Sequence, residues 1–123
     1  DTGTMMRQFD QDCIFCKIAK GDIPSKIVYQ DEFVTAFEDL SPVTPVHILI
    51  IPNGHYRDLN DCGEDEAGLL GHILLSAAKI AKIQGISDSG YRVVANDGPD
   101  AGQTVFHLHF HLLGGRPMNF RSQ

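Results

Sequence analysis

The sequence predicts one α+β domain with a roughly five-stranded antiparallel meander sheet, one long helix and one short helix. Several short strand-like segments surround a single long amphipathic segment, and no strand–helix unit repeats along the chain, which argues against a doubly wound parallel sheet. The length of 123 residues suits one domain with one moderate core. We place this domain at residues 13–123 and expect residues 1–12, which lack hydrophobic periodicity, to form a flexible N-terminal arm.

Both predicted helices follow from apolar residues at helical spacing. The short one covers residues 13–20 and is ended by Gly21 and Pro24. The long one covers residues 64–84, where apolar residues recur at i, i+3, i+4 and i+7. Acidic residues lead this segment and Gly85 follows it, as expected at the two ends of a helix.

Five short runs predict the strands. Residues 27–29 and 33–37 flank a polar turn and predict a hairpin. Residues 46–51 form an unbroken apolar run, which is typical of a central strand buried on both faces. Residues 91–95 and 105–113 are expected to be antiparallel neighbours, joined by the turn-rich segment 96–104.

The last predicted strand carries three histidines, His107, His109 and His111, each separated by one apolar residue. Successive side chains of a strand point to opposite faces, so we expect the three imidazoles on one face, spaced roughly 6 to 7 Å apart at the backbone. The other face is expected to hold Phe106, Leu108, Phe110 and Leu112. Three titratable rings in register add nothing to packing and indicate a functional site, whereas a lone residue such as His72 is expected to be a satisfied, half-buried side chain.

Composition indicates which classes of partner and which compartment suit the chain. The net charge is −6 with histidines neutral, and no run of Lys or Arg is present, which argues against nucleic acid or an anionic membrane surface and favours a small ligand. The longest apolar run is too short to span a bilayer, and no leader-like segment is seen. Three cysteines, an odd count, fit a reducing compartment. We therefore expect a soluble cytoplasmic protein, with nuclear entry left open.

A His-x-His-x-His strand can serve two chemistries, zinc binding or nucleophilic attack on phosphorus. The loop before it favours phosphate, because Gly102 lets the backbone approach a ligand and Gln103 and Thr104 bring N–H donors next to the histidines. An ordinary hairpin turn is the alternative explanation of that loop. A zinc hydrolase with the three histidines as ligands stays open, although no His-Glu-x-x-His arrangement supplies an acidic general base.

Residues 102–117, Gly-Gln-Thr-Val-Phe-His-Leu-His-Phe-His-Leu-Leu-Gly-Gly-Arg-Pro, resemble the signature of the histidine-triad (HIT) superfamily, in the branch of histidine-triad nucleotide-binding (Hint) proteins. The resemblance runs from about residue 13 to 118 and includes segments 14–18, 21–25, 36–42 and 47–52. It implies a HIT-like fold and a homodimer in which the C-terminal residues 118–120 lie near the partner's active site.

The resemblance also implies an enzyme, a purine nucleoside phosphoramidase that needs no catalytic metal. His109 would attack the α-phosphorus of a nucleoside phosphoramidate or aminoacyl-nucleotide, and water would hydrolyse the nucleotidyl-histidine to a monophosphate such as AMP. His111 would donate a proton to the leaving amine, as an imidazolium, while His107 and His47 orient and polarise the site. A nucleotide-binding signalling or scaffold protein with vestigial activity is the non-enzyme alternative.

For the nucleotide, the resemblance implies that Asp39 accepts both ribose hydroxyls, which suits an ionised carboxylate. Gln103 and Thr104 would hold phosphate oxygens, next to Gly102 and Val105, and Asn96 would contact the phosphate or the leaving group. An apolar slot for the base would be formed by Ile14, Phe15, Ile18, Ile23, Phe37 and Leu40.

Four departures from the family pattern bear on substrate and metal. Ala101 precedes Gly102 where many relatives have Gly-Gly, Thr104 replaces a frequent serine, and no tryptophan follows the triad, so the leaving group stays open. Cys13-x-x-Cys16 resembles the pair that joins two histidines on a structural zinc in other HIT relatives; the candidates here are His55 and His107. Two reduced thiols are the alternative. A zinc-bound His107 would hold the segment with the three histidines in place and could not act as a proton carrier.

Overall fold

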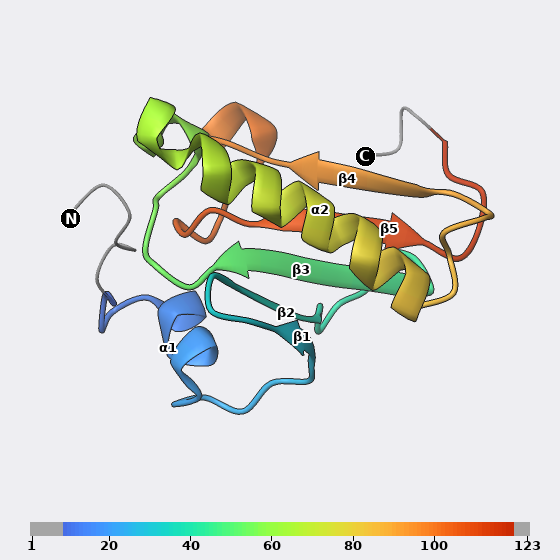
Figure 1. Ribbon diagram of the computed structural model, residues 1–123, viewed down its shortest axis with the longest axis horizontal. Coiled ribbons are helices and arrows are strands. Elements are labelled where there is room, and N and C mark those ends of the chain that lie inside the picture. Colours follow the sequence, from blue (N-terminus) through green and yellow to red (C-terminus); the bar gives the residue numbers. More distant parts are fainter. Residues whose placement is uncertain (1–8, 120–123) are drawn as a thin grey trace.

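The computed structural model describes residues 9–119 and shows two helices on opposite faces of a five-stranded antiparallel sheet (Figure 1). The strands are β1 (Ile27–Gln30), β2 (Val34–Glu38), β3 (Val46–Pro52), β4 (Tyr91–Ala95) and β5 (Phe110–Gly114). The helices are α1 (Ile14–Lys20) and α2 (Ala67–Ile83), with single turns at η2 (Leu59–Asp61), η3 (Glu64–Glu66) and η4 (Pro99–Ala101). The predicted α+β class, with one long and one short helix, is confirmed.

The strand order is β1-β2-β3-β5-β4. The first three strands form the expected meander, and β4 and β5 are antiparallel neighbours as predicted. A strict meander would place β4 beside β3, but β5 lies there instead and β4 forms the edge. The chain leaves β3, crosses the sheet in α2, runs along the edge and returns into the centre, which brings the histidine segment beside the buried β3 (Figure 1).

The two faces of the sheet carry separate apolar clusters. On one face, α2 packs Ile73, Ala77 and Ile80 against the strands. The strand side of that cluster consists of Val34, Ala36, Ile48, Ile50, Phe110 and Leu112. On the other face, Phe15 and Ile18 of α1 pack against Phe37, Leu49 and Ile51. Because strand side chains alternate, His47 and His111 belong to the α1 face.

The predicted strand over residues 105–113 is too long, since the observed β5 begins at Phe110. Before that point the backbone bonds elsewhere: the Leu108 N–H donates to the Tyr56 carbonyl, at 2.6 Å, in the loop after β3. Leu108 is still buried under α2 as predicted, but Phe106, expected on the same buried face, is 53% exposed. His107 and His109 therefore lie in an irregular segment and only His111 lies within the strand.

The predicted arm falls mainly on residues 1–8, which lie outside the described residues. Its end is ordered as a turn, in which the Cys13 N–H donates to the Asp10 carbonyl at 3.0 Å. Within residues 9–119, no helix combines the length and apolar character needed to cross a bilayer.

Candidate active site

Three histidines meet on the α1 face where β3 and β5 run side by side. His47 Nε2 lies 2.9 Å from His111 Nδ1, and the ring centroids of His109 and His111 are 5.2 Å apart. His107 is directed away from this trio and toward α1. The three histidines predicted to share one face are thus divided. His109 and His111 lie with His47, and His107 lies in a different cluster.

The hydrogen bonds of His109 fix which ring nitrogen is free. His109 Nδ1 lies 2.7 Å from the backbone carbonyl of His107, and because a carbonyl only accepts, Nδ1 must carry the hydrogen. Nε2 then keeps its lone pair. The ring is 9% exposed, and Phe15 packs edge-on against it with centroids 5.2 Å apart. This is the arrangement that a nucleophilic imidazole requires.

A second chain of hydrogen bonds orients His47 and His111. The Val43 N–H donates to His47 Nδ1 at 3.1 Å, so the neutral His47 ring carries its hydrogen on Nε2. That hydrogen is donated to His111 Nδ1, which leaves the His111 hydrogen on Nε2. His109 and His111 consequently offer opposite functions, one a lone pair and the other a hydrogen.

Burial, and to a lesser extent the nearby His109 and His47 rings, lower the pKa of His111 to about 4, although the charge of Asp39 opposes this. Burial also lowers the pKa of His47, although the charge of Asp39 opposes this. Both rings are therefore neutral at pH 7, so the expected imidazolium is not present in the free protein. An anionic phosphate beside His111 favours the protonated ring, because an opposite charge raises the pKa of an imidazole.

Asp39 lies next to His47, with Oδ2 3.5 Å from Nε2, while Oδ1 accepts from the Ser41 N–H at 2.7 Å. The ligand atoms of Asp39, His47 and His111 all lie within 4.8 Å of one another, as in a metal site. A metal on His47 Nε2 would force the ring hydrogen onto Nδ1, against the Val43 N–H. The geometry therefore suits proton transfer better than metal binding.

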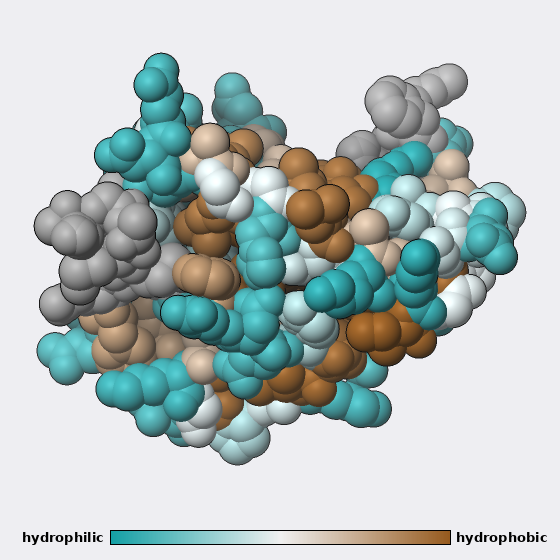
Figure 2. All heavy atoms as spheres, viewed as in Figure 1, coloured by the Kyte–Doolittle hydropathy of each residue, from teal (hydrophilic) through white to brown (hydrophobic). Residues whose placement is uncertain are grey.

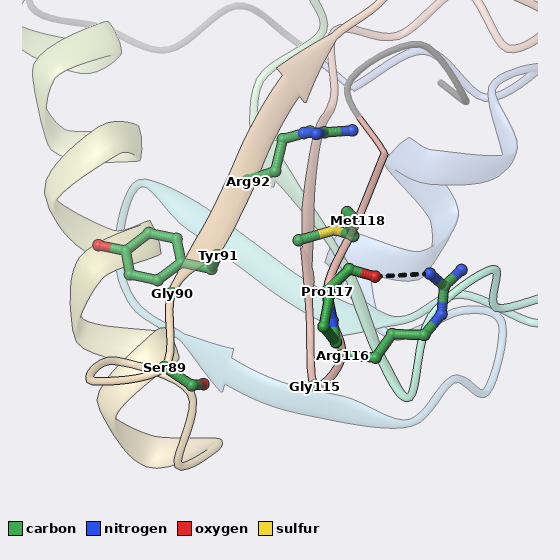
Figure 3. A pocket seen from close by; sticks show the side chains of 8 residues that line it. All are labelled: Ser89, Gly90, Tyr91, Arg92, Gly115, Arg116, Pro117 and Met118. Carbon is green, nitrogen blue, oxygen red and sulfur yellow. Dashed lines mark hydrogen bonds between the residues drawn. The ribbon is translucent and has the colours of Figure 1, made fainter.

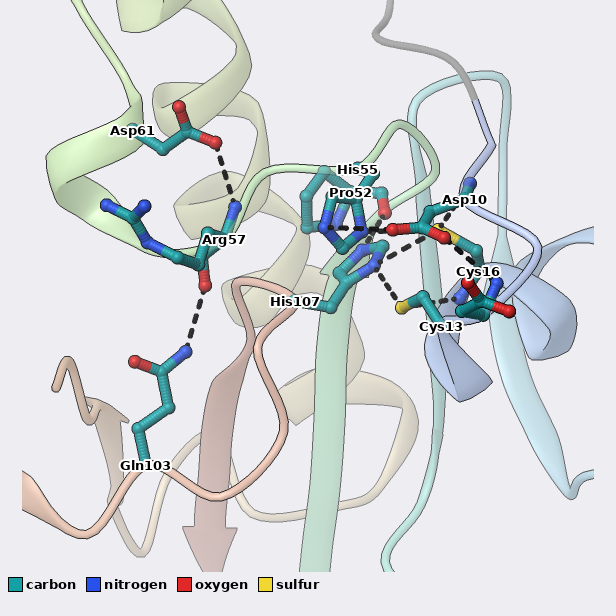
Figure 4. Close-up of polar contacts among 10 residues, drawn as sticks. Asp10, Cys13, Cys16, Pro52, His55, Arg57, Asp61, Gln103 and His107 are labelled. Atoms are coloured by element: carbon teal, nitrogen blue, oxygen red, sulfur yellow. Dashed lines mark hydrogen bonds and ion pairs between the residues drawn. The ribbon is translucent and has the colours of Figure 1, made fainter. Parts of the chain in front are cut away.

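A second cluster joins α1, the loop after β3 and the segment before β5 (Figure 4). Cys13 Sγ lies 3.2 Å from His107 Nδ1, and Cys16 Sγ lies 3.4 Å from His55 Nδ1 and 3.5 Å from His107 Nδ1. The four predicted ligands are thus brought together, with all ligand atoms within 4.8 Å. In a tetrahedral zinc site sulfur and nitrogen ligands are about 3.5 Å apart, so the distances fit.

Both histidines of this cluster direct Nδ1 at the sulfurs. His107 Nε2 lies 2.9 Å from the Pro52 carbonyl and must carry the hydrogen, which leaves Nδ1 bare. His55 Nε2 faces the Asp10 carboxylate at 3.9 Å. Burial raises the pKa of the Cys16 thiol to about 11 and lowers that of His107 to about 4. A bound cation would lower the pKa of Cys16 again, because it favours the thiolate. The donor set therefore fits a structural zinc ion.

The loop 96–104 is held by Gln103, whose buried side chain accepts from the Gly98 N–H and donates to the carbonyls of Arg57 and Val105. These bonds occupy the amide that was expected to contact phosphate, so its observed contacts stabilise the loop. Gly102 has a φ of 81°, which favours glycine, and Thr104 is exposed at the start of the histidine segment.

The residues expected to hold the base divide into two groups. Phe15, Ile18 and Phe37 are buried in the α1 cluster, and Ile23 packs against it. Ile14 is 49% exposed and Leu40 is 98% exposed. The first group forms a buried wall of the expected base site, and the second group lies at its solvent-exposed edge.

Two hollows lie near the C-terminal end of β5. One, of about 260 Å³, is lined by His47, His111 and Asn96, so Asn96 lies beside the trio. Arg92, Arg116 and Met118 are among its other lining residues. The other hollow, of about 540 Å³, lies between residues 89–92 and 115–118 and contains no histidine (Figure 3). Of the two, the smaller hollow is therefore the one that adjoins the histidine trio.

Sequence reasoning missed three groups beside the histidines: the Val43 N–H and the Pro52 carbonyl, which orient two of the rings, and the Asp10 carboxylate, whose charge faces His55. Two of them belong to the backbone and leave no mark in the residue type. Asp10, an acid three residues before Cys13, is the only one that residue type and spacing could have indicated.

The strand order, the histidine trio and the glycine exit from β5 define a HIT-domain protein. The chain belongs to this family, whose domain matches residues 20–118. It is 50% identical over 108 residues to the purine nucleoside phosphoramidase of Escherichia coli strain K12, covering 88% of this chain and 91% of that protein.

Solved structures agree with the fold. A HIT family hydrolase from Legionella pneumophila Philadelphia 1 matches with a TM-score of 0.88 and 46% identity, covering 90% of this chain and 99% of that one. A histidine triad protein from Clostridium difficile matches with a TM-score of 0.89 and 48% identity, covering 91% and 97%. The resemblance drawn from the sequence is confirmed.

Proposed function

We propose that this chain is a purine nucleoside phosphoramidase that acts through a covalent nucleotidyl-His109 intermediate. The observation that carries the proposal is the hydrogen bond from His109 Nδ1 to the His107 carbonyl, which leaves Nε2 as a nucleophile. The similarity to the Escherichia coli phosphoramidase supports the same assignment.

In the first step His109 Nε2 attacks the α-phosphorus, the P–N bond breaks, and the amine leaves with a proton from His111 Nε2. This proton comes from the His111 imidazolium that the anionic phosphate favours, so His111 is left neutral, and His47, with Nε2 2.9 Å from His111 Nδ1, holds that ring in place. In the second step water attacks the phosphorus and gives a proton to the now neutral His111, the P–N bond to His109 breaks, and a nucleoside monophosphate such as AMP is released. No step needs a metal ion.

The nucleotide lies, in this proposal, between the α1 face and the loop 96–104. Asp39 accepts from the ribose hydroxyls, and the Thr104 and Val105 N–H groups meet the phosphate, with Gln103 and Gly102 shaping the loop. Asn96 lies on the leaving-group side, beside His111. The base packs against Phe15, Ile18, Ile23 and Phe37, with Ile14 and Leu40 at the rim.

We further propose that Cys13, Cys16, His55 and His107 hold a structural zinc ion. Its contribution when bound is to cross-link α1, the loop after β3 and the histidine segment. The free cysteines suit a reducing compartment, which supports a cytoplasmic location.

A homodimer completes the proposal. β4 is an edge strand, and Leu74 and Leu75 of α2 are 52% and 72% exposed. Figure 2 shows hydrophobic side chains gathered over the middle of α2 on the side of β4. An edge strand beside exposed leucines suits pairing with a second copy. Of the C-terminal residues expected near the partner's site, Met118 lines the hollow beside His111, and Phe120 lies outside the described residues.

The test is AMP release from adenosine 5′-phosphoramidate by zinc-saturated wild type and His109→Ala, with and without a chelator added at assay. Turnover that persists during a short chelator exposure and falls at least about 1000-fold in His109→Ala supports the proposal, because a nucleophile cannot be replaced by alanine. Immediate loss of turnover on chelation, with AMP affinity unchanged, would indicate the zinc hydrolase. AMP binding without turnover would indicate the signalling or scaffold protein.

Within residues 9–119, the metal-ligating groups already weigh against the zinc hydrolase. His107 clusters with the cysteines and His111 with His47, while His109 belongs to neither group.

A further inference from the structure

We propose that metal occupancy of the Cys13, Cys16, His55 and His107 cluster controls the position of His109, so that metal binding and nucleotide binding are thermodynamically coupled. This inference rests on the proposed function, because it assigns a regulatory input to the same nucleotide site. Two residues, His107 and Phe15, connect the metal cluster to His109. The segment 105–109, which carries His107 and His109, lies outside the strand pairing of the sheet.

The first link is His107. Its ring belongs to the metal cluster, with Nδ1 3.2 Å from Cys13 Sγ and Nε2 2.9 Å from the Pro52 carbonyl. Its backbone carbonyl accepts the hydrogen of His109 Nδ1 at 2.7 Å. A metal that fixes the His107 ring therefore also fixes the acceptor that selects the reactive tautomer of His109.

The second link is Phe15, which lies between Cys13 and Cys16 at the start of α1. Its ring packs edge-on against His107 and His109, with centroids 6.0 and 5.2 Å apart, and against Phe37 at 5.5 Å. α1 has only seven residues, too few for a helix to be stable by itself. Because both cysteine ligands flank Phe15, metal binding holds this ring against the nucleophile.

The segment that carries His107 and His109 has little support from the sheet. The ladders of β5 with β3 and β4 begin at Phe110, so residues 105–109 lie outside them. Within this segment, the described anchors are the Leu108 N–H bond to Tyr56, the Gln103 amide bond to the Val105 carbonyl, the buried Leu108 side chain and the His107 ring, and the ring is the anchor that adjoins His109. Loss of the metal removes one side of the His107 anchor, whereas His47 and His111, which lie in strands, keep their positions.

The metal cluster also opens to solvent. A hollow of about 530 Å³ is lined by Cys13 and His55 together with the carboxylates of Asp10, Asp12 and Asp61. Cys13 and His55 are half-buried, and the three carboxylates attract cations to the opening. Metal can therefore enter and leave without unfolding of the domain, so occupancy follows the free metal concentration.

The experiment measures both halves of a thermodynamic cycle. AMP affinity is determined for zinc-loaded and zinc-free protein by titration calorimetry, and zinc affinity is determined with and without AMP by competition with a chromophoric chelator. We expect zinc to strengthen AMP binding at least about 5-fold and AMP to strengthen zinc binding by the same factor, since coupling is reciprocal. Equal AMP affinities in the two folded forms would overturn the inference.

Two variants separate the coupling from general effects. Asp10→Asn leaves all four ligands in place but removes the negative charge that lies 3.9 Å from His55 Nε2 and lines the opening of the cluster, so zinc affinity should fall about 10-fold or more. In its zinc-saturated form, AMP affinity should return to the wild-type value. Cys62→Ser is the matched control: Cys62 lies outside the cluster, and both affinities should stay unchanged.

If circular dichroism shows that zinc-free protein unfolds, the comparison is made between zinc-loaded and cadmium-loaded protein. Cadmium is the larger ion and displaces His107, so the inference expects different AMP affinities and a changed ¹⁵N signal of the His109 ring. Identical affinities and signals would overturn it. A protein that shows the linkage but never cleaves the P–N bond would refute only the proposed function.

Discussion

The two histidine clusters lie side by side, yet they differ in which ring nitrogen is free. In the metal cluster, the Pro52 carbonyl takes the Nε2 hydrogen of His107, so Nδ1 faces the sulfurs as a bare ligand. In the active-site cluster, the Val43 N–H occupies Nδ1 of His47, so Nε2 becomes a hydrogen donor to His111. A backbone acceptor and a backbone donor thus direct the same side chain to two different chemistries.

The largest expected effect is on the stability of the metal cluster. Removing zinc with a chelator, or by Cys16→Ser, should lower the free energy of unfolding by about 4 kcal/mol, the stabilisation given by a ligand at about 1000 times its Kd. Urea unfolding in zinc and in chelator measures this. Asp39→Asn in the other cluster should leave the zinc-dependent difference unchanged. If zinc adds no stability to wild type, the cluster is a pair of reduced thiols beside two histidines.

The next effect concerns the proton donor of the active-site cluster. His111→Ala should lower kcat/KM for an adenosine phosphoramidate of an alkylamine by about 100- to 1000-fold, the usual contribution of general acid catalysis. With a p-nitrophenyl ester of AMP, the p-nitrophenolate leaves without a proton, so kcat/KM for this substrate should fall less than about 10-fold. Steady-state kinetics on both substrates measures the contrast. Equal losses would show that His111 positions the substrate and donates no proton.

The pH dependence of stability follows from the buried position of His111. Its pKa is lowered from 6.5 to about 4, so between these values the unfolded chain binds a proton that the folded protein excludes. The free energy of unfolding should fall as the pH decreases from 6.5 to 4, by up to about 3 kcal/mol at about 1.4 kcal/mol per pKa unit. Urea titrations of zinc-saturated protein measure this. His111→Asn should show a flatter profile, and an equally steep one would assign the effect to other groups.

The sequence was sufficient for most of the fold because its signals are local. The apolar spacing of α2, the unbroken run of β3 and the glycine after α1 predicted elements that the structure confirms. The strand register near the histidines was not predictable, because the loop after β3 competes for the Leu108 N–H and ends the ladder at Phe110. The insertion of β5 between β3 and β4 is likewise a tertiary outcome that no local pattern specifies.

The candidate site shows the same division. Residue types and family resemblance indicated the four metal-cluster residues, which the structure brings together. They did not indicate that His107 and His109 would serve different clusters. That separation depends on the backbone N–H of Val43 and the backbone carbonyl of Pro52. Nearly every residue type carries these groups, so the sequence does not mark where they act.

The smallest effect concerns His72, a third kind of histidine that belongs to neither cluster. As expected from the sequence it is satisfied and half-buried, with Nε2 2.8 Å from Asp31 Oδ2. Partial burial alone would raise the pKa of Asp31, but hydrogen bonds from the Phe33 and Val34 N–H groups, and then from His72 and Tyr29, lower it to about 2. The ionised carboxylate therefore stabilises the fold above pH 3.8, and this contribution is lost as the pH falls toward 2.

Asp31→Asn should accordingly lower the free energy of unfolding by about 1 kcal/mol at pH 7, a value discounted for the partial exposure of the pair, and by less at pH 3. Asp100→Asn, at an exposed position in η4, is the matched control and should change neither value. Urea unfolding at the two pH values measures the difference. Because His72 donates to a carboxylate and has neither a sulfur nor a second imidazole beside it among the contacts described, zinc affinity and P–N bond cleavage should stay at wild-type levels. A change in either would mean that the division between ligand and proton-donor histidines extends beyond the two clusters.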